Sequence, residues 1–170
     1  MKRLVAFLPL IALCLLSTEA LSQTTFTGAI SQDWGEDGNW TNGLPAVDND
    51  AIIPFGLSVS IEGVLDIDFA ITNAGLIYNN GGVNNYGTIE TLQMSGIYNN
   101  GEITNNGTIS GEGVIHNSSG YITNEGLIAN NGNITNSGYI NNNGYIENGG
   151  AINNYTSGII NNYTSGTIEN

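Results

Sequence analysis

Basic side chains and cysteine are almost missing from this 170-residue chain. Its only Lys and Arg are Lys2 and Arg3, its only His is His116, and its only Cys is Cys14. Residues 23–170 therefore cannot form a disulfide bond. They also lack the cationic side chains that nucleic acid, anionic lipid and sulfated polysaccharide require, which argues against these three classes of partner.

Residues 1–22 have the pattern of a secretory signal peptide. Lys2 and Arg3 precede an apolar run from Leu4 to Leu16, and a polar stretch follows. This run is too short to span a bilayer. Cleavage after Ala20 or Ser22 would remove one of the fifteen acidic residues, so the fourteen that remain give a charge of about −14. We expect a secreted, extracellular or cell-surface protein with no membrane span in the mature chain.

The chain is rich instead in a six-residue repeat, G-x-I-x-N-x, which occurs fifteen times between Gly75 and Asn170. Gly precedes the aliphatic residue by two positions in every unit except the one with Ser95, and Asn follows by two positions in thirteen units. The spacing stretches to seven once and to eight three times, which suits loops at a corner. The aliphatic positions are Ile77, Val83, Ile89, Ile97, Ile103, Ile109, Ile115, Ile122, Ile128, Ile134, Ile140, Ile146, Ile152, Ile160 and Ile168.

This pattern excludes a helix, because Gly and Asn are poor helix formers and a period of six residues does not match the 3.6 residues of a helical turn. Each unit instead predicts a short strand, x-I-x, and a corner, N-x-G, where Gly and Asn tolerate left-handed backbone angles. One unit cannot bury its own Ile, but stacked coils can. The fold class is therefore all-β, a parallel β-solenoid (β-helix). The alternative is a disordered Asn/Gly-rich tract, which would lack regularly spaced Ile.

Gly, Ile and Asn are two residues apart, so in an extended chain they share one face. We expect an inward column of Ile flanked by ladders of Asn, whose stacked amides bond from coil to coil and fix the register. The predicted core includes Ile103, Ile109, Ile122, Ile128, Ile134, Ile140 and Ile146. The predicted ladder residues are Asn79, Asn99, Asn105, Asn124, Asn130, Asn136, Asn142 and Asn148.

The outward residues favour three units per coil, because residues about eighteen apart then stack as favourable pairs. Tyr121 would lie beside Tyr139 on one face. On a second face Tyr78, Tyr98 and His116 would form a column, and on the third Glu90, Glu147 and Glu169 would share a column with Ser110 and Ala129 between them.

Residues 23–74 differ from the repeats, since they hold Trp34, Trp40, Pro45 and Pro54 together with eight acidic residues. We expect an N-terminal cap followed by the first irregular coils, with the regular repeats spanning residues 75–170. The segment DWGEDGNWTNGLPAVDNDAIIP resembles the W-x(5)-W-x(4)-P-x(2)-D-x-D opening of secreted bacterial surface proteins in which a parallel β-helix follows directly. The repeats are similar to the Asn/Gly-rich passenger repeats of adhesin-like and autotransporter-like proteins. No C-terminal cap or translocator pattern precedes Asn170, so we expect a truncated chain.

Few residues suit catalysis or metal binding. His116 occupies an outward strand position, and we interpret it as a surface residue. We interpret Glu147 and Glu169 as part of a solvated acidic face rather than as the catalytic pair of a glycosidase. We expect no cofactor. Calcium is a possible ligand, because acidic turns supply the oxygen atoms that it prefers, here from Asp33, Glu36, Asp37, Asp48 and Asp50.

These observations predict a non-catalytic structural or adhesive protein whose partners are an extracellular surface, glycans or other copies of itself. One alternative is a glycan-binding module that uses Tyr121 and Tyr139. An ice-binding module is a weaker alternative, because Thr residues are scattered over different faces. A β-helix carbohydrate-active enzyme is the third.

Overall fold

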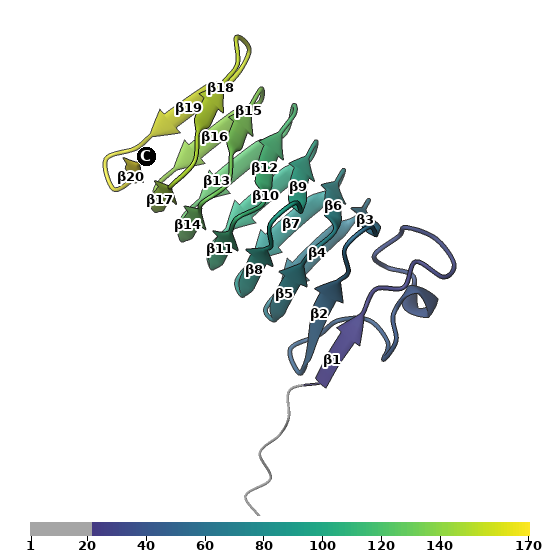
Figure 1. The fold of residues 1–170 in the computed structure, drawn as a ribbon. Coiled ribbons are helices and arrows are strands. Elements are labelled where there is room, and N and C mark those ends of the chain that lie inside the picture. Colours follow the sequence, from purple (N-terminus) through teal and green to yellow (C-terminus); the bar gives the residue numbers. More distant parts are fainter. Residues whose placement is uncertain (1–21) are drawn as a thin grey trace, which may run out of the picture.

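The computed structural model describes residues 22–170, which form a parallel β-solenoid of stacked coils (Figure 1). The chain winds from β1 and β2 at one end of the stack to β18, β19 and β20 at the other. The predicted signal peptide lies outside the described residues apart from Ser22, which begins β1. The fold predicted from the repeat is confirmed.

From β2 onward each full coil contributes one strand to each of three sheets, β1 adds one more strand to the first sheet, and all the strand pairs within the sheets are parallel. The first sheet has the order β1 (Ser22–Thr25), β2 (Asn49–Ile53), β5 (Ala70–Asn73), β8 (Thr88–Thr91), β11 (Thr108–Gly111), β14 (Leu127–Asn130), β17 (Tyr145–Asn148) and β20 (Thr167–Glu169). The second sheet has the order β3 (Ser58–Ile61), β6 (Leu76–Asn79), β9 (Gly96–Asn99), β12 (Val114–Asn117), β15 (Ile134–Asn136) and β18 (Ile152–Asn154). The third sheet has the order β4 (Val64–Ile67), β7 (Gly82–Asn85), β10 (Glu102–Asn105), β13 (Tyr121–Asn124), β16 (Tyr139–Asn142) and β19 (Ile159–Asn162).

The register of the strands places aliphatic residue over aliphatic residue. In the third sheet Ile103 pairs with Ile122, Ile122 with Ile140, and Ile140 with Ile160. The same residue type therefore returns every 18 to 20 residues, which is one circuit of three units. This confirms the coil size predicted from the outward columns.

The core of the stack is one continuous column of aliphatic side chains from Ile53 to Ile146. Every core Ile named from the sequence is buried, with 1–3% of its surface exposed. At the C-terminal coil of the described chain, Ile152, Ile160 and Ile168 are only partly buried. Because each unit exposes its Ile to the coils on both sides, the core forms only through stacking.

The glycines of the repeat are required for a different reason from the one that the sequence suggested. The left-handed backbone predicted for the N-x-G corners is wrong: among the described residues, positive φ occurs only at Met94, Gly28, Gly43, Gly56 and Gly111, and none of these is the glycine that precedes an aliphatic position. The preceding coil leaves no room for a side chain at these glycines. In the column of stacked corner glycines Gly81, Gly101 and Gly120, a Cβ would lie 2.0–2.1 Å from a carbonyl oxygen of the preceding coil.

The N-terminal segment packs its aromatic side chains onto the start of the stack. Trp34 and Trp40 are each 5% exposed, and their ring centroids are 4.8 Å apart. Phe26 contacts Trp40 at 5.1 Å, and Trp34 lies 6.4 Å from Phe69 of the first coils. The N–H of Trp34 also donates to the carbonyl of Ser60 at 2.9 Å, so this segment extends the second sheet below β3.

We predict that Gly144→Ala destabilises the fold by roughly 1–3 kcal/mol or more, because its Cβ would lie 2.2 Å from the carbonyl oxygen of Gly126 and 2.7 Å from the carbonyl carbon of Glu125. Urea unfolding measures the change. Gly63→Ala is the matched control, since a Cβ there meets nothing within 4 Å and its φ is outside the left-handed region. Equal stability of the two variants would contradict the steric role of the repeat glycines.

Candidate functional surfaces

Two unbroken Asn ladders run along the inside of the solenoid. In each one the amide Nδ2 donates to the Oδ1 of the Asn in the following coil, with distances of 2.7–2.8 Å. The ladder of the second sheet contains Asn79, Asn99, Asn117, Asn136 and Asn154. The ladder of the third sheet contains Asn85, Asn105, Asn124, Asn142 and Asn162.

In these two ladders every amide except the last also donates to a backbone carbonyl of the following coil. Asn142 donates to Asn162 at 2.8 Å and to the carbonyl of Thr167 at 2.9 Å, while its own oxygen accepts from Asn124 at 2.8 Å. The side chain of Asn142 is fully buried, so these partners replace water. The ladders thus satisfy buried polar groups while they fix the register of the coils.

A third ladder, in the first sheet, is interrupted. Thr91 and Gly111 occupy two of its positions, and Asn130 then donates to Asn148 at 3.3 Å. Among the described residues the buried Oδ1 atoms of Asn79, Asn85 and Asn130 have no hydrogen-bond partner. These are the first amides of the three continuous runs, and no amide precedes them to donate.

On the outside of the third sheet, Tyr121 pairs with Tyr139 as the sequence predicted. The two rings are parallel within 6° and their centroids are 4.8 Å apart, so they stack face to face rather than lying side by side in one plane. Each tyrosine covers one face of the other, so the two rings form a stabilising cross-strand pair.

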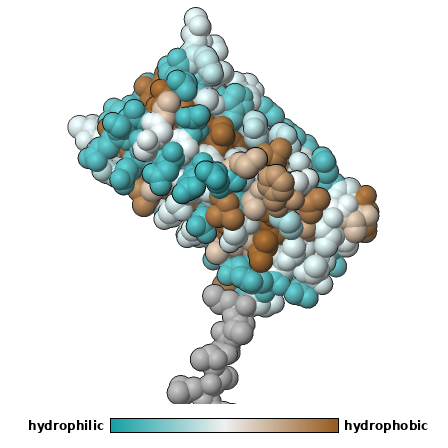
Figure 2. All heavy atoms as spheres, viewed as in Figure 1, coloured by the Kyte–Doolittle hydropathy of each residue, from teal (hydrophilic) through white to brown (hydrophobic). Residues whose placement is uncertain are grey.

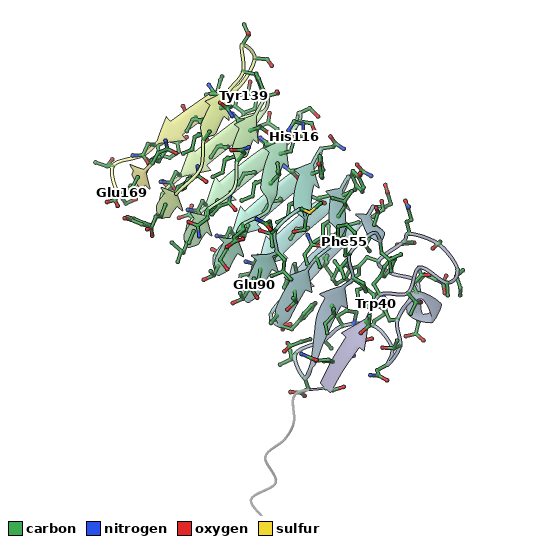
Figure 3. All side chains as sticks on the ribbon, in the orientation of Figure 1. Trp40, Phe55, Glu90, His116, Tyr139 and Glu169 are labelled. Carbon is green, nitrogen blue, oxygen red and sulfur yellow. The ribbon has the colours of Figure 1, made fainter. Side chains whose placement is uncertain are left out.

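The second sheet carries the predicted column of Tyr78, Tyr98 and His116. Tyr78 and Tyr98 are 5.2 Å apart between ring centroids, and Tyr98 and His116 are 5.6 Å apart. The His116 Nδ1 also hydrogen bonds with the hydroxyl of Thr135 in the next coil. His116 is partly buried by these contacts, and in Figure 3 it lies on the outer side of the stack rather than in the core.

On the first sheet, Glu147 pairs with Glu169 in adjoining strands, and Ser110 and Ala129 separate them from Glu90. All three Glu side chains are exposed, as the sequence predicted for a solvated acidic face. A hydrogen bond to Glu169, helped by partial desolvation and by the negative charges of Glu169 and Glu147, raises the pKa of Tyr145 to about 12.

The candidate calcium ligands are not brought together. Within residues 22–170 no group of three or more His, Cys, Asp or Glu side chains is placed to hold a metal ion. Asp33, Asp37 and Asp50 each accept a hydrogen bond from a backbone N–H, of Gly35, Leu44 and Ala70 respectively. These carboxylates stabilise turns and the contact between coils. Glu36 and Asp48 are exposed.

Asn39, which lies in the same acidic loop, organises the N-terminal segment. Its Oδ1 accepts from the N–H groups of Ile30 and Ser31 at 2.9 and 3.0 Å, and its Nδ2 donates to Ser31 and Asp33 at 3.1 and 2.9 Å. The side chain is fully buried. The Asn39 oxygen is therefore engaged and is not free to bind a metal ion.

Sequence reasoning missed an exposed apolar patch formed by Phe55 and Met94. Phe55 is 70% exposed and Met94 is 76% exposed, and they flank a shallow hollow of about 170 Å³ whose lining includes Leu57 and Leu76. Figure 2 shows brown and tan spheres at the place where Figure 3 labels Phe55. The available signal was the stretched spacing between Ile89 and Ile97, which puts Leu92 and Met94 into a corner loop.

Met94 has a further unusual feature. Its φ of 67° makes it the one described residue other than glycine with a left-handed backbone. Such a conformation is uncommon for a side chain without a local polar group and is found at functional sites more often than elsewhere. The corner loop thus holds an apolar side chain outward at some cost in backbone energy.

None of the helical structure described in residues 22–170 is long and apolar enough to cross a membrane. Comparisons with protein-family models, with curated proteins and with solved structures found no significant match. The class of the protein, a parallel β-solenoid with internal Asn ladders, is therefore established by its strand register and its hydrogen bonds.

We predict that Asn142→Asp destabilises the fold by roughly 1–3 kcal/mol or more at neutral pH, because a buried carboxylate would face the acceptor oxygens of Asn162 and Thr167. Burial raises the pKa of such a carboxyl, so the protonated form is favoured in the fold. The penalty is therefore small below the unfolded pKa of about 4 and grows as pH rises through the folded pKa. Thermal unfolding at several pH values measures this.

Asn141→Asp is the matched control for the ladder prediction. Asn141 points outward, and its Oδ1 accepts from Asn161 at 2.9 Å, a bond that Asp can also accept. Its stability should change little. Equal melting temperatures of the Asn142 and Asn141 variants at pH 7 would contradict the role of the internal ladder.

We predict that Glu169→Gln lowers the pKa of Tyr145 from about 12 towards its ordinary value near ~10, since the carboxylate acceptor is lost. In the parent, the contribution of protonated Tyr145 to stability is present below the unfolded pKa and is lost as pH rises through about 12. NMR titration of the tyrosine ring signals measures the shift. Glu90→Gln, in the same column but several coils away, should leave the titration of Tyr145 unchanged.

Proposed function

We propose that this protein is a non-catalytic structural and adhesive β-solenoid that works outside the cell. The observation that carries the proposal is the exposed patch of Phe55 and Met94 on the stacked coils. Single exposed apolar residues are common, but grouped ones with a hollow between them mark a surface that contacts another body. The solenoid holds this patch in place without any requirement for a ligand.

The interior supports a scaffold rather than a small-molecule site. Ile side chains and Asn amides fill it, and the cavity among the core side chains from Ile61 to Ile103 measures about 10 Å³, no more than one water can occupy. Small-molecule sites are typically clefts of ~300–1,000 Å³ with convergent polar groups. The outer faces therefore offer the better binding surface.

The extracellular location rests on residues 1–22, which have the charge and length pattern of a signal peptide. The acidic mature surface adds to this proposal, because its charge of about −14 keeps single copies apart at low ionic strength. The patch then provides a short-range apolar contact to a surface of neutral or positive charge.

The adhesion test measures binding of the purified protein to beads coated with alkyl chains, with amines or with neutral glycans. We predict that Phe55→Ser combined with Met94→Ser lowers binding to the alkyl-coated beads by roughly tenfold or more, since few residues dominate a contact. Tyr121→Ser combined with Tyr139→Ser is the matched control on another face. It should bind the alkyl beads as the parent does.

Glycan binding in this assay, together with a separate polysaccharide-cleavage assay, separates the alternatives. Glycan binding that is lost in the tyrosine variant would favour a glycan-binding module instead. Cleavage of a polysaccharide that is lost in Glu147→Gln would favour an enzyme. A folded parent protein that binds none of the beads would contradict the adhesive part of the proposal.

A further inference from the structure

Six Asn–Gly pairs lie in the repeats, and such pairs are chemically reactive. The backbone nitrogen that follows Asn can attack the side-chain carbonyl, and Gly presents no Cβ to hinder that attack. The reacting Asn residues would be Asn80, Asn100, Asn106, Asn131, Asn143 and Asn148. The fold therefore decides which of these pairs can react.

In five of the pairs the glycine N–H is held by the coil below. A bonded N–H must first be released by local opening, which costs free energy and slows the attack. The bonds run from Gly81 to the carbonyl of Ile61 (3.0 Å), from Gly101 to Asn79 (3.1 Å), from Gly107 to Asn85 (2.9 Å), from Gly144 to Asn124 (2.9 Å) and from Gly149 to Asn130 (2.9 Å).

Gly132 is the exception. Within residues 22–170 its N–H has no hydrogen-bond acceptor, although the preceding Asn131 N–H donates to the carbonyl of Gly111 at 2.7 Å. At four of the other five Asn–Gly corners one carbonyl accepts both N–H groups, as Asn124 does from Asn143 and Gly144. Gly111 stands where the ladder normally has Asn or Thr, and its φ of 125° gives this corner a different backbone path.

The side chain of Asn131 also has room to react. It is exposed and borders an open hollow of about 300 Å³ whose lining includes Glu147, Gly149 and Glu169. Its amide oxygen lies against Gly149 in the next coil, which has no side chain to hold it. In contrast, Asn143 is held by a hydrogen bond from its amide to Glu125 at 2.7 Å.

We propose that the Asn131–Gly132 pair is a site of spontaneous deamidation in the folded protein. The Gly132 nitrogen bonds to Cγ of Asn131 and gives its proton to water. The C–N bond to the side-chain amide then breaks, and the leaving nitrogen takes a proton from water to become ammonia. Water then opens the five-membered succinimide to give aspartate or isoaspartate. Either product adds a carboxylate to the hollow that already contains Glu147 and Glu169. This site is independent of the proposed adhesive function.

The test is mass spectrometry of the folded protein during mild incubation. Because residues 23–170 contain no Lys or Arg, cleavage after tyrosine is the useful digestion, and it places Asn131, Asn143 and Asn148 on three different peptides. We predict that Asn131 deamidates roughly tenfold or more faster than the other five, a factor in keeping with one hydrogen bond. In urea, all six rates should become similar.

Two controls keep the experiment decisive. Asn131→Gln should remove the fast event and leave the other rates unchanged, while Asn143→Gln should leave the rate at Asn131 unchanged. Hydrogen exchange tests the cause, since the Gly132 amide should exchange faster than those of Gly144 and Gly149. A folded-state rate at Asn131 no higher than at Asn143 and Asn148 would overturn the proposal, as would strong protection of the Gly132 amide.

Discussion

The contact between stacked glycine corners is the constraint on which the rest of this solenoid depends. A Cβ on Gly101 would lie 2.0 Å from the carbonyl oxygen of Gly81, and one on Gly120 would lie 2.1 Å from that of Gly101. The corners approach so closely because their N–H groups bond to the coil below, which continues the strand spacing of ~4.8 Å around the turn. Only at this spacing can an Asn amide reach the amide above it, so the ladders depend on the glycines.

The two kinds of bond at a corner point in opposite directions. The backbone N–H groups of Asn143 and Gly144 donate to the coil below, whereas the side-chain amide of Asn142 donates to the coil above. Each corner is therefore tied to both neighbours, and the stack has a direction. The unpaired oxygens of Asn79, Asn85 and Asn130 mark where this direction begins, because a ladder needs a donor below and the preceding residues, Ile61, Ile67 and Gly111, supply none.

The period of the repeat was enough to predict the fold class, the three-unit coil and the inward Ile and Asn columns, because each follows from local chain geometry. The outward pairs such as Tyr121 with Tyr139 followed from the same count. The reason for the glycines was predicted wrongly, since their crowding comes from a neighbouring coil and not from their own backbone angles. The apolar patch was missed for a similar reason: whether Phe55 and Met94 face solvent depends on how two corners far apart in sequence are stacked. The role of Trp34 and Trp40 as a cap stays a prediction; both side chains are buried, and Trp34 lies against Phe69.

Three of the six positions in each unit are fixed by stacking, so information about function can lie only at the other three and in the stretched corners. Those positions form columns whose members are one coil apart, which places like side chains at nearly the spacing of neighbouring strands. Like charges at that spacing repel, yet Glu147 and Glu169 are adjacent. Their repulsion is weak because both side chains are exposed to water and screened by salt. A binding site on such a protein is therefore a column or a corner, and the corner with Met94 departs from the repeat in both its left-handed backbone and its exposed apolar side chain.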